Sequence, residues 1–330
     1  MNTISVFIED NVFKEATGVV GTINDAVYLM KKKKYADFTI VFRDRRDMVV
    51  YKKELDRFRI PYSDSDAGFF LDQSAVREAL KICMFYIRPY DEDAFRLMMK
   101  KFGRIEQEKI EELLMQSRVS GEKPGVLLHR YVDLLPPSGT KAEGQLLIRA
   151  LEREYNSFEE CLEILNFCNF WRTLRANRED EDDEKIYYLD QFCERVKTYD
   201  RVCDAKPVAE RILSFEQYHR DQWEVIRKDT VSLMQLKEYF ETEHDYVFIA
   251  GAVEGVYPRM EKGEGESETA IISEETIESE RKLFRAILSK ANGNAAIAFH
   301  ESEEREGYRI PCERSRFINE IPRDRIRYVY

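Results

Sequence analysis

The sequence of 330 residues predicts an α/β protein in which a parallel β-sheet is interrupted by an all-α inserted subdomain. Runs of β-forming apolar residues alternate with helical patterns at both ends of the chain, over residues 1–98 and 229–330. Between them, residues 99–228 carry one helical pattern after another without a convincing strand. One α/β domain formed by the two ends, with a helical insertion between them, is the simplest organisation that accounts for both observations.

The first part of the chain predicts a β-α-β unit followed by two helices. The runs "ISVFI" (4–8) and "DFTIVFR" (37–43) are rich in β-formers and flank a stretch with apolar residues at helical spacing. Strands joined in this way are parallel, with a right-handed crossover. A helix is predicted at about 47–58, and after a short extended piece a second helix ends before Pro89.

The insertion contains one clear helix start and one predicted loop. Ser157 followed by Glu160 forms the pattern of a capping box, so we expect a helix to begin there. The stretch "LLPPSGTKAEG" (134–144) is rich in proline, glycine and serine and is predicted to be a loop between helices.

The last third of the chain returns to the α/β pattern. Short apolar runs predict strands at 231–236, 245–251 and 294–300, and residues 276–291 predict a helix before the last of them. Because residues 246–250 are apolar on both faces, we expect a central strand that is covered by helices on each side. The sequence "AVEGVYP" follows this strand, at the end where parallel sheets carry their functional loops.

Composition and charge limit the classes of function. The chain has 43% hydrophobic and 35% charged residues, without a long apolar span or the basic start of a secretory signal, so we expect an intracellular, cytoplasmic protein. A net charge of -11 argues against nucleic-acid binding over the whole surface but permits a local basic groove. Basic clusters occur at 31–34 and 42–47 and an acidic cluster at 178–185, each of which alone is typical of a solvated face.

The residues by themselves indicate no reaction. Six cysteines and four histidines are scattered without metal-ligand spacing, so no metal site is predicted. No GxxxxGK[ST] phosphate loop is present; "GTKAEG" has no strand before it, and "GVVGT" lies inside a helical pattern. Glu278, Glu280 and Arg281 are predicted to form a solvated helix start whose acids suit the helix dipole.

The order of the segments resembles a known family. "DFTIVFRDRRDMVVYKKELDRFRIPYSDSDAGFF", "ALKICMFYIRPYDEDAF", "VSLMQLKEYFETEHDYVFIAGAVEGVYP", "ESERKLFRAILSKANGNAAIAFH" and "SRFINEIP" resemble, in sequence and in order, the C-terminal half of UvrD/Rep/PcrA-type superfamily 1 DNA helicases. The resemblance covers roughly residues 1–100 and 229–325. It implies a RecA-like parallel sheet, similar to a P-loop NTPase domain but lacking the P-loop, with a helical subdomain inserted in it.

The resemblance also implies a function. The chain would complete an ATP site and a single-stranded DNA track only with an N-terminal RecA-like ATPase lobe, in cis or in trans, which supplies the phosphate loop and magnesium. ATP is then the expected cofactor, none is expected to bind tightly to this chain alone, and no membrane partner is expected. The alternatives are a catalytically inactive scaffold or DNA-binding module in a repair or defence complex, and a protein-interaction module for which nucleic acid is irrelevant.

Three residues would face ATP if the family pattern applied to this chain. Arg43 in "IVFRD" matches the arginine that reaches the γ-phosphate, and Lys290 in "AILSKA" stands where the family has a second arginine finger. Glu243 matches the acid that contacts the nucleotide ribose. Lys290 keeps the charge of an arginine but loses its planar fork, and Ile287 replaces the glycine of the same motif.

The resemblance further implies DNA contacts just before the central strand. Where relatives have Thr-x-His-Ser-x-Lys-Gly-Leu-Glu, this chain has "QLKEYFETE" (235–243), in which Gln235, Lys237 and Tyr239 are candidates for DNA binding. The three glutamates of this segment would repel phosphate unless Lys237 and neighbouring bases compensate. Whether the ATPase and helicase activities survive these changes stays open at this point.

Overall fold

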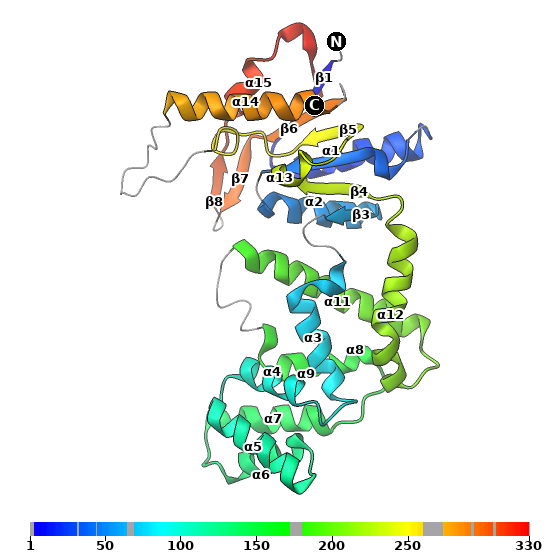
Figure 1. The fold of residues 1–330 in the computed structure, drawn as a ribbon, viewed down its shortest axis with the longest axis vertical. Helices are drawn as coiled ribbons and strands as arrows, with labels where there is room; N and C mark the ends of the chain where they lie inside the picture. The colour runs from blue at the N-terminus through cyan, green and yellow to red at the C-terminus, as the bar shows by residue number, and fades with distance from the viewer. Residues whose placement is uncertain are drawn as a thin grey trace. The chain divides into compact units, whose positions relative to one another are not determined.

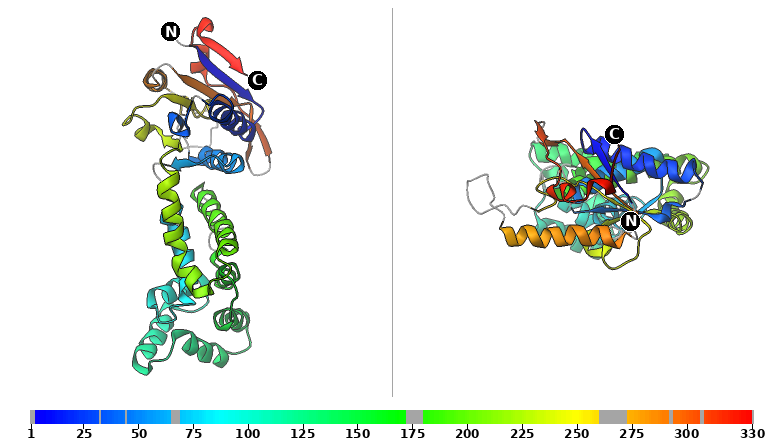
Figure 2. Two further views of the ribbon diagram at one scale, coloured as in Figure 1. Left: turned by 90° about the vertical axis from the view of Figure 1, so that its right-hand side faces the viewer. Right: turned by 90° about the horizontal axis from the view of Figure 1, so that it is seen from above.

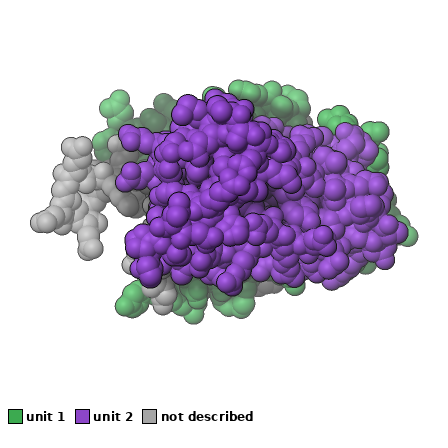
Figure 3. All heavy atoms as spheres, turned by 90° about the horizontal axis from the view of Figure 1, so that it is seen from below, with its two compact units in different colours: residues 1–68, 224–330 green, residues 69–223 purple. Residues whose placement is uncertain are grey.

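The computed structural model describes residues 3–31, 33–43, 45–64, 69–171, 180–259, 273–291, 294–305 and 308–329. Parts of three charged clusters, Lys32, Asp44 and residues 178–179, lie outside these ranges. The chain forms two compact units, which are coloured green and purple in Figure 3: unit 1 comprises residues 1–68 and 224–330, and unit 2 comprises residues 69–223.

The division between the units differs from the predicted boundaries of the insertion. The sequence placed the first boundary at residue 98, whereas the structure divides the chain after Gly68. The reason is α3 (Ser74–Phe85), which contacts α4 (Glu92–Phe102), α9 (Glu163–Phe167) and α11 (Asp180–Val202), all helices of unit 2.

Unit 1 is built on a seven-stranded parallel sheet with the strand order β3-β4-β2-β5-β6-β1-β9 (Figure 1). Its strands are β1 (Ile4–Glu9), β2 (Phe38–Phe42), β3 (Tyr62–Asp64), β4 (Val231–Gln235), β5 (Tyr246–Ile249), β6 (Ala295–His300) and β9 (Ile326–Val329). Strand β5 lies fourth of seven, which confirms the central strand predicted from its apolar faces. A separate antiparallel hairpin follows β6 and consists of β7 (Ser302–Arg305) and β8 (Tyr308–Pro311).

Side chains that alternate along the strands form a core on each face of the sheet. In β2, Phe38, Ile40 and Phe42 pack toward α1 (Val12–Tyr28) and α2 (Arg45–Phe58). Val41 faces the other way, toward α13 (Leu236–Tyr239), α14 (Glu274–Lys290) and α15 (Arg316–Asn319). Figures 1 and 2 show the sheet between α14 on one side and the pair of α1 and α2 on the other. Helices on both faces explain why the central strands β2 and β5 carry apolar residues toward each face of the sheet.

All regular secondary structure among the described residues of unit 2 is helical, as the sequence predicted, and includes a short turn of 3₁₀-helix at Phe70–Asp72. Besides α3, α4, α9 and α11 it contains α5 (Gln107–Ser120), α6 (Pro124–Leu134), α7 (Gly139–Glu152), α8 (Phe158–Cys161) and most of α12 (Val208–Ile226). The predicted helix start is confirmed, because Oγ of Ser157 accepts a hydrogen bond of 3.0 Å from the backbone N–H of Glu160.

The prediction of a loop over 134–144 is wrong for its second half. Helix α7 begins at Gly139, and the side chain of Ser138 caps it by accepting a hydrogen bond from the backbone N–H of Lys141. The serine that suggested a loop is therefore the N-cap of a helix, which is the position where serine is most favoured.

Among the described residues, no helix has both the length and the apolar character needed to cross a membrane.

Candidate functional site

The loops that follow the parallel strands meet at one edge of the sheet. Arg43 follows β2, Gln235 is the last residue of β4, and the segment 250–258 follows β5. Because these strands are parallel and adjacent in the order β4-β2-β5, their carboxyl ends lie side by side.

Arg43 is held at this edge by a glutamate of α14. Its Nη2 donates to Oε1 of Glu280 at 2.7 Å, and the two side chains are only 12% and 13% exposed. The other carboxylate oxygen of Glu280 accepts a hydrogen bond of 3.0 Å from the backbone N–H of Arg259. The prediction that Glu280 lies on a solvated helix start is therefore wrong. It lies three residues after Ile277 and four before the buried Phe284, a helical spacing that could have placed it on the inner stripe.

Tyr257 lies beside the Arg43 guanidinium, whose carbon is 5.5 Å from the centroid of the tyrosine ring. The ring is fully buried, and this burial raises the pKa of its hydroxyl. Within the described residues, both this hydroxyl and Nη1 of Arg43 are buried without a hydrogen-bond partner. Two neighbouring polar atoms are thus left with unused hydrogen-bonding capacity at the strand edge.

The "EGVYP" segment after β5 is fixed by contacts to distant parts of the chain. Glu254 accepts hydrogen bonds from Nε and Nη2 of Arg316, at 3.1 Å and 2.8 Å, in a two-pronged pair. Gly251 has the left-handed backbone angle φ of +62°, and its N–H donates to the buried Glu15 at 2.8 Å. The segment is therefore anchored to unit 1, with Tyr257 in its core and Glu254 only partly buried.

The segment 235–243 ends β4, forms α13 and then returns over the α14 face of the sheet. Gln235 and Glu238 form a reciprocal capping box at the start of α13, so one of the three glutamates has a structural partner. Gln235 is half-buried and Lys237 is exposed, whereas Glu241 and Glu243 are both exposed. Lys237 is thus the base of this segment that is open to a ligand, with two exposed acids nearby in the chain.

Tyr239 is placed differently from the other DNA-binding candidates. Its side chain is fully buried, its hydroxyl donates to the carbonyl oxygen of Ile287 at 2.9 Å, and its ring stacks on His244 with the centroids 4.5 Å apart. A side chain in this position cannot contact DNA while unit 1 is folded, so the expectation for Tyr239 is replaced by a role in packing.

Lys290 and Glu243 both lie near His244, at the opposite end of the strands. Nζ of Lys290 donates to the carbonyl oxygen of Phe240 at 2.5 Å, and Glu243 is exposed just before β5. Both charges act on the buried His244: burial lowers the pKa of its imidazole, Lys290 lowers it further, and Glu243 raises it. Nδ1 of His244 lies 3.0 Å from Oγ1 of Thr39, which anchors this end of the segment to β2.

The three residues expected to face ATP therefore form two groups. Glu280, the partner of Arg43, and Lys290 lie ten residues apart on α14, which corresponds to about 15 Å along a helix. Arg43 is at the carboxyl ends of the strands, whereas Lys290 and Glu243 are at the amino ends of β5 and β6. The structure therefore places Lys290 and Glu243 at one end of the strands and Arg43 at the other.

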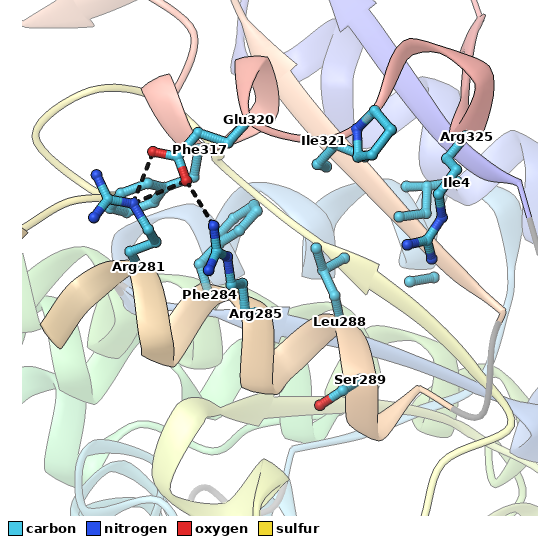
Figure 4. A pocket seen from close by; sticks show the side chains of 12 residues that line it. Ile4, Arg281, Phe284, Arg285, Leu288, Ser289, Phe317, Glu320, Ile321 and Arg325 are labelled. Atoms are coloured by element: carbon cyan, nitrogen blue, oxygen red, sulfur yellow. Dashed lines mark hydrogen bonds and ion pairs between the residues drawn. The ribbon is translucent and has the colours of Figure 1, made fainter. Parts of the chain in front are cut away.

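A pocket of about 320 Å³ between α14, α15 and the start of β1 contains none of these candidates. Figure 4 shows that Arg281 and Arg285 of α14 both point to the carboxylate of Glu320 at its rim. The interior of the pocket is formed by apolar side chains, among them Phe284, Leu288 and Phe317.

Comparison with known proteins identifies the family to which this chain belongs. A sequence profile of the UvrD-like helicase C-terminal domain matches residues 2–302, most of the chain. The chain belongs to this family. The match and the parallel sheet of unit 1 confirm the fold class expected from the resemblance, a RecA-like domain with a helical insertion.

Two relatives of this UvrD-like domain show how much of a helicase it covers. The chain is 22% identical over 335 residues to the ATP-dependent DNA helicase PcrA of Bacillus subtilis, an alignment that covers 97% of this chain and 44% of the relative. It is 23% identical over 340 residues to the ATP-dependent DNA helicase Rep of Escherichia coli, covering 97% of this chain and 48% of the relative. The chain thus spans slightly less than half the length of either relative.

Proposed function

We propose that this chain is the C-terminal lobe of an ATP-dependent DNA helicase. It completes an ATP site and a single-stranded DNA track together with an N-terminal RecA-like ATPase lobe, in cis or in trans, which supplies the phosphate loop and magnesium. The observation that carries the proposal is the family match over residues 2–302, with two ATP-dependent DNA helicases aligned over nearly the whole chain. A cytoplasmic location fits this function.

Lys290 and Glu243 are the proposed contacts to the nucleotide. Lys290 bonds a neutral carbonyl oxygen, so its ammonium group can exchange that partner for a phosphate oxygen without leaving a buried charge unpaired. Glu243 is exposed three residues after Phe240, whose carbonyl oxygen Lys290 bonds, and a ribose contact requires such an exposed acid. ATP would bind where the second lobe closes on this end of the sheet, and we expect no nucleotide to bind tightly to the chain alone.

Arg43 is the proposed third contact, but it needs a rearrangement that the others do not. Its Nη2 donates a hydrogen bond to Glu280, while its buried Nη1 has no hydrogen-bond partner among the described residues. A phosphate that approached Arg43 could use Nη1 without breaking the ion pair, provided that the second lobe reaches this edge of the sheet.

Gln235 and Lys237 are the proposed contacts to single-stranded DNA. They lie where β4 ends and α13 begins, and the Lys237 side chain is exposed. Exposed Glu241 follows four residues after Lys237, so the track on this lobe carries little net positive charge and must depend on the second lobe for most of its affinity.

The proposal is tested by combining the chain with an N-terminal lobe that contains the phosphate loop and measuring ATP hydrolysis with and without single-stranded DNA. We expect DNA-stimulated hydrolysis, and a loss of it in Lys290→Ala. Lys282→Ala removes an exposed lysine from the same helix and is the matched control. No hydrolysis with any N-terminal lobe of the family, or equal rates in the two variants, would contradict the proposal.

A catalytically inactive helicase fold is the second candidate, and specific residues favour it. Lys290 stands in place of an arginine, and Ile287, in place of a glycine, is fully buried with its carbonyl oxygen bonded to Tyr239. Measurement of ATP hydrolysis beside ATP binding in the two-lobe assembly distinguishes the candidates, because ATP bound through the phosphate loop of the N-terminal lobe should stay unhydrolysed if this chain is an inactive scaffold. A protein-interaction module would in addition show no DNA affinity that falls with salt.

A further inference from the structure

The β7–β8 hairpin brings three potential metal ligands together at the end of β6. His300 is the last residue of β6, and Glu303 lies in the following strand. The hairpin pairs Ser302 with Pro311, and the backbone N–H of Cys312 continues this pairing by donating to the carbonyl oxygen of Glu301 at 2.8 Å. Cys312 therefore returns next to His300, although it lies twelve positions later in the chain.

The side chains of His300, Glu303 and Cys312 converge. One ligand atom from each, an imidazole nitrogen, a carboxylate oxygen and the thiol sulfur, lies within 4.8 Å of the others. Nε2 of His300 is 3.4 Å from a carboxylate oxygen of Glu303. The imidazole is buried, whereas Glu303 and Cys312 are partly exposed, so the group is anchored on its inner side and can be reached from outside.

A buried carboxylate orients the histidine. Nδ1 of His300 lies 2.5 Å from Oε2 of Glu15, a fully buried residue of α1. Glu15 in turn accepts hydrogen bonds from the hydroxyl of Tyr51 at 2.7 Å and from the N–H of Gly251 at 2.8 Å. A carboxylate on one imidazole nitrogen, with the other nitrogen directed at the ligand group, is the usual arrangement around a metal-binding histidine.

We propose that His300, Glu303 and Cys312 bind a divalent transition-metal ion, with Zn²⁺ as the best match. Imidazole, thiolate and carboxylate are all zinc ligands, and the combination disfavours the oxygen-seeking Mg²⁺ and Ca²⁺. Zinc bonds of about 2.0–2.3 Å at a tetrahedral angle place ligand atoms roughly 3.3–3.8 Å apart. The 3.4 Å between Nε2 of His300 and Glu303 already fits this range, and separations of up to 4.8 Å elsewhere in the group need to close by about 1 Å, which rotation of the partly exposed Glu303 and Cys312 side chains can supply.

A divalent ion would offset most of the negative charge that these ligands and Glu15 carry. Glu15, Glu303 and a Cys312 thiolate would bring three negative charges, which a divalent ion offsets in large part. Arg309 adds a positive charge on the same hairpin, where its Nε donates to Oγ of Ser302 at 2.9 Å. A bound metal would link Cys312, just after the hairpin, to His300, the last residue of β6. Its fourth coordination position would be open to solvent or another ligand.

A protonated His300 that bridges Glu15 and Glu303 would satisfy the same hydrogen bonds without a metal. That arrangement involves no thiol, so dependence on Cys312 separates the two. The chain is stripped with a chelator and titrated with Co²⁺ and then Zn²⁺. We expect equimolar Co²⁺ uptake with the visible absorption of a tetrahedral site and a thiolate charge-transfer band, and displacement by Zn²⁺.

Cys312→Ser should abolish the thiolate band and weaken Zn²⁺ binding at least about tenfold, and Glu303→Gln should weaken binding similarly while keeping the band. Cys203→Ser, which changes a partly buried cysteine of unit 2, is the matched control and should bind as the unaltered chain does. Circular dichroism of the metal-free variants verifies that each is folded. The proposal is overturned by absence of saturable uptake, by binding that survives Cys312→Ser unchanged, or by an equal loss in Cys203→Ser.

Discussion

Nη2 of Arg43 lies 2.7 Å from Oε1 of Glu280, and this ion pair joins the end of β2 to the first half of α14. The pair connects two segments that are more than 230 residues apart in the chain. Both side chains are largely buried, so each depends on the other to offset the cost of removing its charge from water.

Arg43→Ala should therefore lower the free energy of unfolding of unit 1 by about 3 kcal/mol, because it leaves the carboxylate of Glu280 buried without its partner. Urea unfolding followed by circular dichroism measures the change. Arg57→Ala removes an exposed partner of Glu54 in the same unit and should cost less than about 1 kcal/mol. Equal losses in the two variants would mean that the Arg43 pair is no more important than a surface pair.

Lys237→Ala should weaken binding to single-stranded DNA and reduce the slope of log affinity against log salt by about 0.7, the value for one lost phosphate contact. Tyr239→Phe is the paired variant: it removes only the hydrogen bond to Ile287 and should cost about 1 kcal/mol of stability without changing the slope. Filter binding over a salt series measures both slopes. A reduced slope in Tyr239→Phe would show that this residue reaches DNA after all.

Gly251→Ala should destabilise unit 1 by about 1–2 kcal/mol or more, because the left-handed backbone disfavours a side chain and a Cβ atom would lie 2.8 Å from Oδ2 of Asp47. Gly21 lies inside α1, where a Cβ atom would meet nothing within 4 Å. Gly21→Ala should accordingly stabilise the chain by about 0.5–1 kcal/mol. Thermal unfolding of the two variants should give shifts of opposite sign, and shifts of the same sign would refute the explanation.

The stability of unit 2 should fall when the pH is lowered from about 6.5 to about 4. Burial, with the nearby charge of Arg195 adding to it, lowers the pKa of His219 from 6.5 to about 4. Between these values the unfolded chain binds a proton that the folded chain does not, so unfolding becomes easier as the pH falls. The loss should be of the order of 2 kcal/mol.

Urea titrations at several pH values measure this loss, and His219→Phe should reduce the dependence on pH. The ring already packs edge-on against Phe70 and Phe215, so an apolar ring suits the site. His129→Gln, which replaces an exposed histidine of the same unit, is the control. An unchanged pH dependence in His219→Phe would exclude this residue as its source.

Lys290→Arg should raise DNA-stimulated ATP hydrolysis of the two-lobe assembly by at least about tenfold, because a guanidinium holds two phosphate oxygens where an ammonium holds one. Lys282→Arg, on the exposed side of the same helix, should have no effect. A rate that stays unchanged in Lys290→Arg would favour the inactive scaffold instead.

The sequence predicted the strands whose side chains are buried, because burial leaves a run of apolar residues in the sequence. Strands β2, β5 and β6 are apolar on both faces because helices cover the sheet on each side, and such runs are visible in one sequence. Strand β9 and the β7–β8 hairpin were missed. Strand β9 has the polar Arg327 and an exposed Tyr328 at its centre, and every residue of β8 is exposed, so neither carries an apolar pattern.

The site could be predicted only as a set of residues. Arg43, Lys290 and Glu243 were identified by resemblance, but their separation into two groups depends on the direction of α14 against the strands, which the order of segments does not reveal. Tyrosine is a residue type that is common in DNA contacts. Only the packing of Tyr239 against Ile287 and His244 shows that its side chain points inward. The pairing of His300 with Cys312 depends on hairpin register, which is set in three dimensions.

Strand β9 pairs with β1 in parallel and forms one border of the sheet. It lies at residues 326–329, beyond the end of the family match at residue 302. A chain shortened to that match would leave the N–H and C=O groups along one side of β1 open to strands of other molecules, a known route to aggregation. The short β9, whose central Arg327 and Tyr328 are exposed while Ile326 and Val329 pack against the two cores, therefore covers the edge of β1 with a border that is itself charged.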